Sequence, residues 1–433
     1  MGFRSIADRR AAGKALRNHL PRTELGGWKA PGTRPDLIPQ LEAAVAGRQA
    51  DLLPLRWGRM AQSPFRFYRG SAALLAADLG SGPTAGIEVG LCGDAHLLNL
   101  GAYADPEGRL VFDLNDFDEA CRGPFEWDLW RLAASVVLAG REAGHTDARA
   151  RAAVAAMAAT WRSSLHRFAE LPAREVARVL VRAEEGRKAL APVFAQAALD
   201  TPGALMAKAV EAEGSGARFL ERPPLVKRLN ARELASAKAA LAPYLDTLAP
   251  ERRQVMERYE VVDGSRRVLG CGSIGVLNWV LLFRGVSDED PLFLEIKGTR
   301  PSCWKLEETG HRGRAVAEAT RRLQTWADPF LGWTSVGGQP FLVRQWSDHK
   351  ASIDLALLAG DGLEDYAALC GLVLAKAQAR TGDPAMLAGY AGRSDKLDRA
   401  LAAFATACAD QVERDWRAFK AALARGELEA IEA

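Results

Sequence analysis

The sequence predicts an α+β protein with two lobes, a small β-rich lobe and a large, mainly helical lobe. Five strand patterns and one helical pattern follow each other between residues 256 and 346, whereas the Ala- and Leu-rich segments on both sides place apolar residues three and four apart. Residues 1–255 and 347–433 would therefore build the large lobe together, with a pair of short strands at 86–114. A chain of 433 residues is long enough for two or three packed units.

The bulk composition is that of an ordinary soluble protein. The 57 basic and 54 acidic residues leave a net charge of only +3, so no whole-protein field favours nucleic acid or a membrane surface. The six cysteines include no C-x-x-C pair, which is typical of reduced thiols, and the N-terminus lacks the apolar run of a signal peptide. We expect a cytoplasmic protein with no nucleic-acid or membrane partner, and the sequence leaves its oligomeric state open.

A glycine-rich turn lies near the start of the β-rich block. Gly270, Gly272 and Gly275 follow the spacing G-x-G-x-x-G, with Ser273 inside the turn, between two strand patterns. Glycines at a hairpin tip let backbone N–H groups approach phosphate oxygens because no Cβ is in the way. A dinucleotide site would need a helix after the glycines, but here a strand follows, which is the arrangement of a kinase phosphate loop. The pattern by itself is also that of an ordinary glycine-rich hairpin.

Three further residues of the β-rich block are candidates for nucleotide binding. Lys297 closes the strand pattern P-L-F-L-E-I-K, and beside a phosphate loop this is the position of the lysine that binds phosphates in kinases. Glu318, on the helix that follows, could turn toward that lysine, although it could equally be an exposed residue among arginines. Gln345 is the next-to-last residue of the strand pattern P-F-L-V-R-Q-W, where a kinase-like lobe would have the hinge whose backbone binds adenine.

The segment 92–99, C-G-D-A-H-L-L-N, carries the candidate catalytic groups. Asp94 and Asn99 are five residues apart, which is the spacing of the kinase catalytic loop H-R-D-x-x-x-x-N. In that loop the aspartate accepts or orients the proton of the acceptor hydroxyl, and the asparagine oxygen binds Mg²⁺. His96 with several nearby aspartates also leaves a metallohydrolase cluster open, although a single histidine is a poor set for zinc.

The same segment resembles the loop H-G-D-x-H-x-x-N of aminoglycoside phosphotransferases and choline kinases, with Cys92 in place of the first histidine. In those families a strand after the loop ends in an aspartate that chelates Mg²⁺. The resemblance therefore implies Asp113, at the end of R-L-V-F-D, whereas counting back from Asp128 in G-P-F-E-W-D-L favours Asp116. We expect Asp113 to be the main metal ligand within the segment 112–119, with Asp116 as a second or alternative ligand and Asp128 as a buried anchor.

The order of these motifs is the reverse of that in kinases, where the glycine loop and the lysine precede the catalytic loop. A circular permutation would explain the reversed order. Residues 369–383, L-C-G-L-V-L-A-K-A-Q-A-R-T-G-D, support it because they resemble the helix that normally precedes the catalytic loop. Residues 20–425 as a whole resemble an uncharacterised bacterial family of unknown function that is grouped with the protein-kinase-like superfamily. The resemblance implies a bilobal, circularly permuted protein-kinase-like fold.

These patterns lead to one main functional hypothesis and three alternatives. The main hypothesis is an ATP- and Mg²⁺-dependent phosphotransferase that acts on an unidentified hydroxyl acceptor, with a small molecule as the expected class. Asp94 would be the base, Lys297 would neutralise the phosphates and Glu318 would hold that lysine. The alternatives are transfer of AMP on the same fold, a non-catalytic ATP-binding pseudokinase, and a metal-dependent hydrolase.

Overall fold

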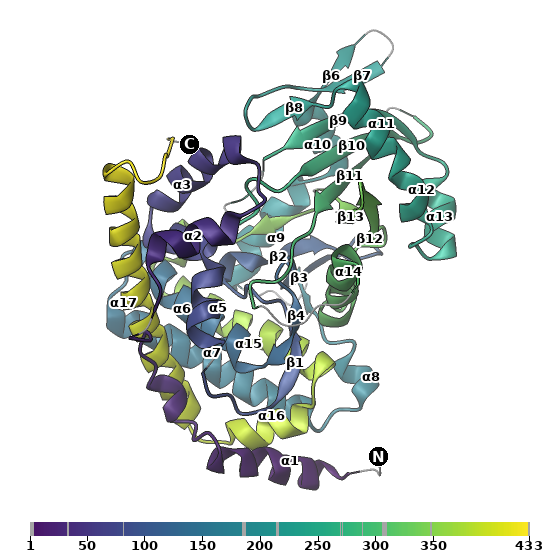
Figure 1. Ribbon diagram of the computed structural model, residues 1–433. Coiled ribbons are helices and arrows are strands. Elements are labelled where there is room, and N and C mark those ends of the chain that lie inside the picture. Colours follow the sequence, from purple (N-terminus) through teal and green to yellow (C-terminus); the bar gives the residue numbers. More distant parts are fainter. Residues whose placement is uncertain are drawn as a thin grey trace.

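The protein has an α+β fold, seen here in a computed structural model (Figure 1). The β-rich part, with strands β6 to β13, lies at one end of the molecule and the long helices lie at the other. The structure describes residues 4–32, 34–80, 82–183, 188–213, 216–268, 270, 272–287, 289–304, 310–346 and 349–431. No helix in these ranges is both long and apolar enough to cross a membrane.

The β-rich part is built on a six-stranded antiparallel sheet with the strand order β12-β13-β11-β10-β9-β8. Helix α14 (Arg312–Leu323) connects β11 to β12 and packs on β12 and β13. The strands are β8 (Val226–Arg228), β9 (Glu260–Arg267), β10 (Asn278–Arg284), β11 (Pro291–Gly298), β12 (Gly332–Val336) and β13 (Gln339–Gln345).

Two details of this sheet differ from the sequence prediction. The segments Y-E-V-V-D and R-R-V-L-G, predicted as two strands, are largely one continuous strand, β9, because no turn interrupts residues 260–267. Strands β12 and β8 were not predicted. β12 is a short segment that pairs with β13 across the glycine turn 337–338, and its pairing partner is what defines it as a strand.

Both faces of the sheet are covered, which explains the continuous apolar run in β10. Leu281 and Phe283 pack in one cluster with helices α11 to α13, whereas Val280 and Leu282 pack in another with α10 and strand β7 of the β6–β7 hairpin. Alternate residues of a strand point to opposite faces, so a strand covered on both sides is apolar throughout. These covering elements are α10 (Pro202–Ala209), α11 (Ala231–Ala239), α12 (Leu241–Leu245), α13 (Pro250–Met256), β6 (Val210–Glu213) and β7 (Gly216–Phe219).

The helical part combines segments from both ends of the chain in one hydrophobic core. The most extensive contact between two of its helices is that of α7 with α15, and α17 packs across α6 and α7 (Figure 1). The long helices are α6 (Glu126–Glu142), α7 (Asp147–Phe168), α15 (Gly362–Thr381) and α17 (Lys396–Ala424). The shorter ones are α1 (Ile6–Ala15), α2 (Leu37–Val45), α3 (Leu53–Ala61), α4 (Pro64–Gly70), α5 (Ala72–Leu79), α8 (Ala173–Val176), α9 (Ala191–Leu199) and α16 (Pro384–Ala391).

Two small sheets in the helical part present loops toward the β-rich part. The predicted strands at 86–91 and 109–114 exist, but they pair with different partners: β1 pairs with β4, and β3 pairs with β2 in a sheet of order β14-β2-β3-β5. The loop 92–99 leaves β1, and the acidic segment 115–120 connects β3 to β4. The strands are β1 (Glu88–Leu91), β2 (Leu100–Ala104), β3 (Leu110–Leu114), β4 (Cys121–Pro124), β5 (Val181–Arg182) and β14 (Ala351–Ser352). Leu91 at the end of β1 pairs with Cys121 at the start of β4. The loop 92–99 and the segment 115–120 therefore lie at the same end of this strand pair.

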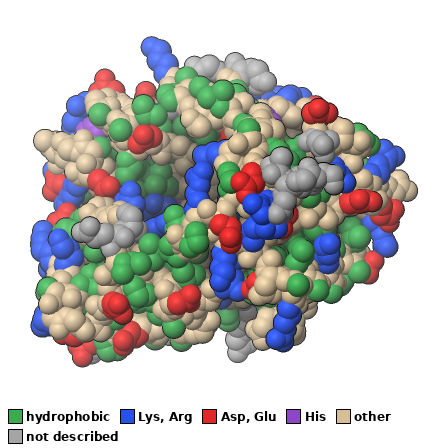
Figure 2. All heavy atoms as spheres, turned by 90° about the horizontal axis from the view of Figure 1, so that it is seen from above, with side chains coloured by type: hydrophobic (Ala, Val, Ile, Leu, Met, Phe, Trp, Pro, Cys, Tyr) green, Lys and Arg blue, Asp and Glu red, His purple; other side chains and the backbone are tan. Residues whose placement is uncertain are grey.

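Acidic and basic side chains are interspersed over the surface in Figure 2. The face shown there carries no large area of one sign, in keeping with the small net charge of +3.

Candidate functional site

A buried aspartate fixes the start of the loop 92–99. Both carboxylate oxygens of Asp128, at the start of α6, accept backbone N–H groups, from Cys92 at 2.8 Å and from Gly93 at 3.0 Å. Gly93 has a φ of 79°, and a Cβ there would collide with the carbonyl of Glu119, so only glycine fits this turn. Burial raises the pKa of Asp128 to about 6, although the two N–H bonds oppose the shift. The expected role of Asp128 as a buried anchor is confirmed.

Asp94 is paired with a fully buried arginine. The guanidinium of Arg131 lies 2.7 Å from the Asp94 carboxylate, and it stacks on the ring of Tyr68 with its carbon 3.8 Å from the ring centroid. Burial disfavours the charge on Arg131, but the Asp94 carboxylate outweighs burial and the pKa of Arg131 is raised. The Asp94 carboxylate is therefore held by a charge-assisted hydrogen bond.

The two other polar residues of the loop have distinct surroundings. The Asn99 amide donates a hydrogen bond to the Asp94 carbonyl at 2.8 Å, which leaves its side-chain oxygen as the acceptor. His96 is buried, its Nε2 lies 3.9 Å from the Asp94 carboxylate, and its Nδ1 has no hydrogen-bond partner among the described residues. Burial, with the charges of Arg69 and Arg131, lowers the pKa of His96 well below its usual value, which favours the neutral ring.

The acidic segment meets the lysine of the β-rich part. Lys297, at the end of β11, donates from its ammonium group to the carboxylate of Asp118, and only 5 % of the lysine is exposed. Burial would lower the pKa of Lys297, but Asp118 and Asp116 outweigh it, so the pKa is raised. Burial and the neighbouring Asp118 raise the pKa of Asp116. Glu119, the residue after Asp118, accepts a hydrogen bond from the backbone N–H of Cys303 at 2.6 Å. This bond attaches the acidic segment to the chain that follows β11.

The glycine turn between β9 and β10 is bound by the N-terminal segment rather than standing free. The Arg48 guanidinium donates to the carbonyls of Gly272 at 2.7 Å and Ile274 at 2.8 Å, and Arg56 donates to Gly272 at 3.0 Å. Burial and the charge of Arg56 lower the pKa of Arg48 to about 9. Two cations thus lie directly behind the turn. Within the predicted turn, Leu269 and Cys271 lie outside the described residues.

These segments enclose a cavity of about 90 Å³. It brings together six of the residues predicted from sequence, although about 170 residues separate the two groups in the chain: Asp94, Asn99 and Asp116 with Gly270, Gly272 and Ser273. Arg69, His96, Asp118 and Glu119 complete the lining. Arg131 and Asp118 were missed as partners by sequence reasoning. The only available signal was the position of Arg131 three residues after Asp128, one helical turn along α6.

Asp113, the preferred metal ligand, lies away from this cavity. Its carboxylate is fully buried and accepts from the ammonium group of Lys376 on α15, with the backbone N–H of Thr325 at 3.3 Å. Asp113 lies within β3, which is buried on both faces at this point, whereas Asp116 comes after the end of that strand. Asp116, three residues further on, lines the cavity.

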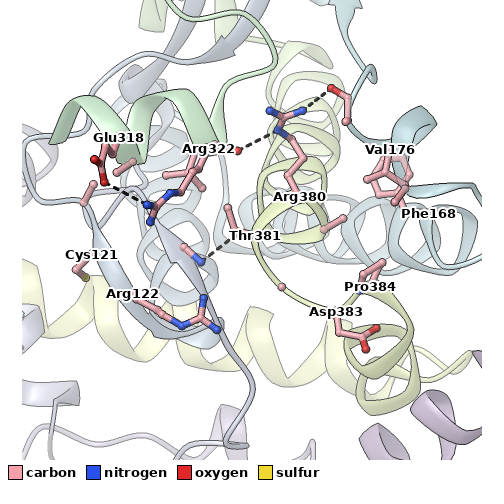
Figure 3. A pocket seen from close by; sticks show the side chains of 18 of the residues that line it. Cys121, Arg122, Phe168, Val176, Glu318, Arg322, Arg380, Thr381, Asp383 and Pro384 are labelled. Carbon is pink, nitrogen blue, oxygen red and sulfur yellow. Dashed lines mark hydrogen bonds and ion pairs between the residues drawn. The ribbon is translucent and has the colours of Figure 1, made fainter. Parts of the chain in front are cut away.

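Glu318, Gln345 and Gly275 are also engaged elsewhere. The Glu318 carboxylate pairs with Arg314 at 2.7 Å and Arg322 at 3.2 Å on its own helix, as Figure 3 shows for Arg322, whereas Lys297 pairs with Asp118. The backbone N–H of Gln345 donates to Asp328 at 2.5 Å and its carbonyl accepts from Lys350 at 3.1 Å. The carbonyl of Gly275 accepts from the N–H of Gln49 at 2.8 Å. None of these three residues lines the cavity.

The cavity offers hard oxygen donors but no complete metal cage. Among the described residues, no group of three or more His, Cys, Asp or Glu side chains is placed so that it could hold a metal ion. Mg²⁺ is usually held by one or two carboxylates together with substrate phosphates and water, and not by an all-protein cage. The Asn99 oxygen and the Asp116 carboxylate on one wall fit that requirement.

Searches of curated proteins and of solved structures find no match to this chain. A family model described as "Uncharacterized protein conserved in bacteria (DUF2252)" matches residues 48–422, a range that includes the loop 92–99, the acidic segment, the glycine turn and Lys297. The description of that family names no activity. Because the match covers most of the chain, the protein belongs to this bacterial family.

Proposed function

We propose that the protein is an ATP- and Mg²⁺-dependent phosphotransferase that acts on a hydroxyl group. The observation that carries this proposal is the cavity in which Asp94, Asn99 and Asp116 face the glycine turn 270–273. Lys297 adds a buried cation bonded to the acidic wall. Phosphoryl transfer needs positioning and charge neutralisation more than covalent chemistry, and this set of groups supplies both.

The order of elements in the β-rich part supports the same proposal. In the run from β9 to β13, the glycine turn lies between the first two strands, Lys297 is on the third, and α14 connects the third to the fourth. Kinases have a glycine-rich loop over the phosphates and a lysine on the third strand, followed by a helix. A circularly permuted kinase-like fold is therefore part of this proposal.

In the proposed reaction Asp94 accepts the proton of the acceptor hydroxyl. The acceptor oxygen forms a bond to the γ-phosphorus while the bond from that phosphorus to the β-phosphate oxygen breaks, which releases ADP. Arg131 would hold the Asp94 carboxylate in place during the transfer, because its guanidinium donates to that carboxylate at 2.7 Å.

Lys297 and the glycine turn would bind the phosphates, and Asn99 and Asp116 would hold Mg²⁺. A bound Mg²⁺ ion neutralises phosphate charge. Lys297 would exchange the Asp118 carboxylate for a phosphate oxygen. A cavity of about 90 Å³ admits a phosphate group but is smaller than the pockets of about 300–1,000 Å³ that hold drug-sized ligands. Binding of ATP therefore requires the glycine turn to move away from the acidic segment.

The first test is thermal unfolding with ATP and Mg²⁺. At about one hundred times its dissociation constant, ATP should add about 2.7 kcal/mol of stability to the wild type. Lys297→Met and Asp116→Asn should lose that shift, whereas Glu318→Gln should keep it because Glu318 pairs with Arg314 and Arg322 outside the cavity. The proposal would be overturned if ATP and Mg²⁺ together did not raise the unfolding temperature of the wild type.

The transferred group is identified by labelling. Incubation with γ-labelled ATP should leave label on the acceptor, and α-labelled ATP should leave none. The reverse distribution would show AMP transfer instead. A candidate acceptor is a small hydroxylated molecule, and Asp94→Asn should abolish its labelling while preserving the nucleotide-dependent thermal shift.

A further inference from the structure

A second, larger cavity lies beside α14, which contributes Glu318 and Arg322 to its wall (Figure 3). Its volume is about 920 Å³, within the range of small-molecule pockets. Its walls come from α14, from β1 and β4, from the segment 168–177 after α7, and from the end of α15 with the start of α16. The proposed phosphotransfer chemistry makes no use of this cavity.

Arg312 separates the two cavities. It lines the larger cavity, but its guanidinium donates to the carbonyls of Arg300 at 3.0 Å, Ala120 at 2.9 Å and Asp118 at 2.6 Å. These bonds hold the acidic segment from behind. The larger cavity is therefore a separate space on the opposite side of that segment, and Arg312 is already engaged by the backbone.

The remaining charged groups give the larger cavity a basic character. Arg9, Arg122, Arg322 and Arg380 line it besides Arg312, against two carboxylates, Glu318 and Asp383. Arg9 pairs with Asp383 at 3.2 Å, whereas the single carboxylate of Glu318 is shared by Arg322 at 3.2 Å and Arg314 at 2.7 Å and so offsets only part of the charge of Arg322.

The other arginines leave an excess of positive charge. Arg380 donates to backbone carbonyls, among them those of Arg322 at 3.0 Å and Gln324 at 2.9 Å, which do not neutralise its charge. Arg122 pairs at 3.3 Å with Glu88, with both side chains more than 60 % exposed, and such surface pairs are weak. In addition, the Nε of Arg9 is buried with no hydrogen-bond partner in the described part of the chain.

The rest of the lining is apolar. Phe168, Leu171, Val176, Leu323 and Pro384 contribute, together with several alanines. Guanidinium groups bind carboxylate and phosphate oxygens through paired N–H donors, whereas the apolar wall favours a hydrocarbon body. A fully hydrated inorganic anion would use the arginines but leave the apolar wall without a partner.

We propose that this cavity is a binding site for a small organic anion, that is, a carboxylate or phosphate group on an apolar body. The anionic group contacts Arg122 and Arg322, and the apolar body lies against the wall formed by residues 168–177 and Leu323. This assignment does not depend on the phosphotransferase proposal, because no nucleotide takes part in it.

The test is calorimetric titration of the full chain, without nucleotide, with octanoate, octylamine and inorganic phosphate. Octanoate should bind saturably, and octylamine and inorganic phosphate should bind at least about tenfold more weakly. Equal binding of octylamine would contradict the role of the arginines, and equal binding of inorganic phosphate would contradict the role of the apolar wall. The absence of saturable octanoate binding would overturn the proposal.

Matched variants locate the site. Arg322→Ala with Arg122→Ala should weaken octanoate binding by at least about tenfold, because both charged contacts are removed. Arg314→Ala is the control: Arg314 also pairs with Glu318 four residues away and is similarly exposed, at 61 % against 71 % for Arg322, but it does not line the cavity.

Ala319→Trp, which fills the space from α14, provides a second and independent loss of binding. Octanoate affinity that is unchanged in both the arginine double variant and Ala319→Trp would refute the site. Affinity reduced equally by Arg314→Ala would refute it as well.

Discussion

The position of Asp94 depends on groups from its own loop and from helix α6. Arg131 from α6 pairs with its carboxylate, the Asn99 amide binds its carbonyl, and Asp128 fixes the two residues before it. The side chains that line the cavity are thus oriented by buried groups behind them. Such supporting contacts are what keep a site in one geometry.

Glu295 illustrates how charge stabilises the interior of the β-rich part. It is buried on β11, accepts from Arg344 at 2.6 Å and from the Asn278 amide at 2.7 Å, and lies two residues from Lys297. Burial opposes its ionisation, but Arg344 and Lys297 outweigh burial and lower the pKa of Glu295 from 4.5 to about 2.

This pKa gives a prediction with a definite sign. The folded-state pKa lies below the unfolded value, so the ionised pair stabilises the fold above pH 4.5, and this stabilisation is lost as the pH falls from 4.5 toward 2. At pH 7, Glu295→Gln should lower the free energy of unfolding by about 3 kcal/mol because the buried Lys297 and the half-buried Arg344 lose their counter-charge. In urea titrations at pH 7, 4 and 3, the difference from wild type should shrink steadily. Glu318→Gln, a surface control, should change stability by less than about 1 kcal/mol at each pH.

At the scale of elements, the contact between α7 and α15 depends on one glycine. A Cβ on Gly371 of α15 would collide with the backbone carbonyl of Met157 on α7, so the two helices approach as closely as their backbones allow. In the sequence, Gly371 is only a helix-weakening residue within an apolar pattern.

Gly371→Ala should therefore destabilise the protein despite the better helix propensity of alanine. We expect a loss of about 2 kcal/mol, because backbone atoms cannot move aside as a flexible side chain can. Gly203→Ala in α10 is the matched control: a Cβ there meets open space, with its nearest neighbour at 3.9 Å, so stability should be unchanged or slightly higher. Chemical denaturation of both variants checks this, and equal effects would contradict the close approach of α7 and α15.

At the scale of the whole molecule, the Asp113–Lys376 pair joins segments 263 residues apart. Asp113 comes from β3 in the first part of the chain and Lys376 from α15 near its end, on either side of the β-rich part. The pair is inside the core that these segments share. The carboxylate of Asp113, which sequence reasoning expected to bind the metal ion, is thus bound to Lys376.

A double-mutant cycle tests that structural role. Lys376→Met alone should cost about 3–5 kcal/mol because it leaves the Asp113 carboxylate buried without a cation. Adding Asp113→Asn should recover part of the loss, since the amide is neutral. If the double variant keeps the ATP- and Mg²⁺-dependent thermal shift, Asp113 is not needed for the metal. Loss of the shift in that variant would return Asp113 to the site.

The sequence alone determined the features that depend on neighbouring residues. The α+β class followed from the periodicity of apolar residues, and the loop 92–99, the glycine turn and Lys297 were found from local spacing. The sequence did not predict strand β12, nor that two predicted strands are one strand, β9. Pairing partners, and not the segment itself, decide where a short strand forms.

Only the tertiary structure decided which of these groups meet. Asp118 binds Lys297, Arg131 binds Asp94, and Asp116 instead of Asp113 lines the cavity. A spacing of three residues cannot show which carboxylate faces a cavity and which faces the core, because the direction of each depends on the strand and on what packs against it. Charged partners come from segments far apart in the chain, and burial makes each pairing obligatory only after the fold has formed.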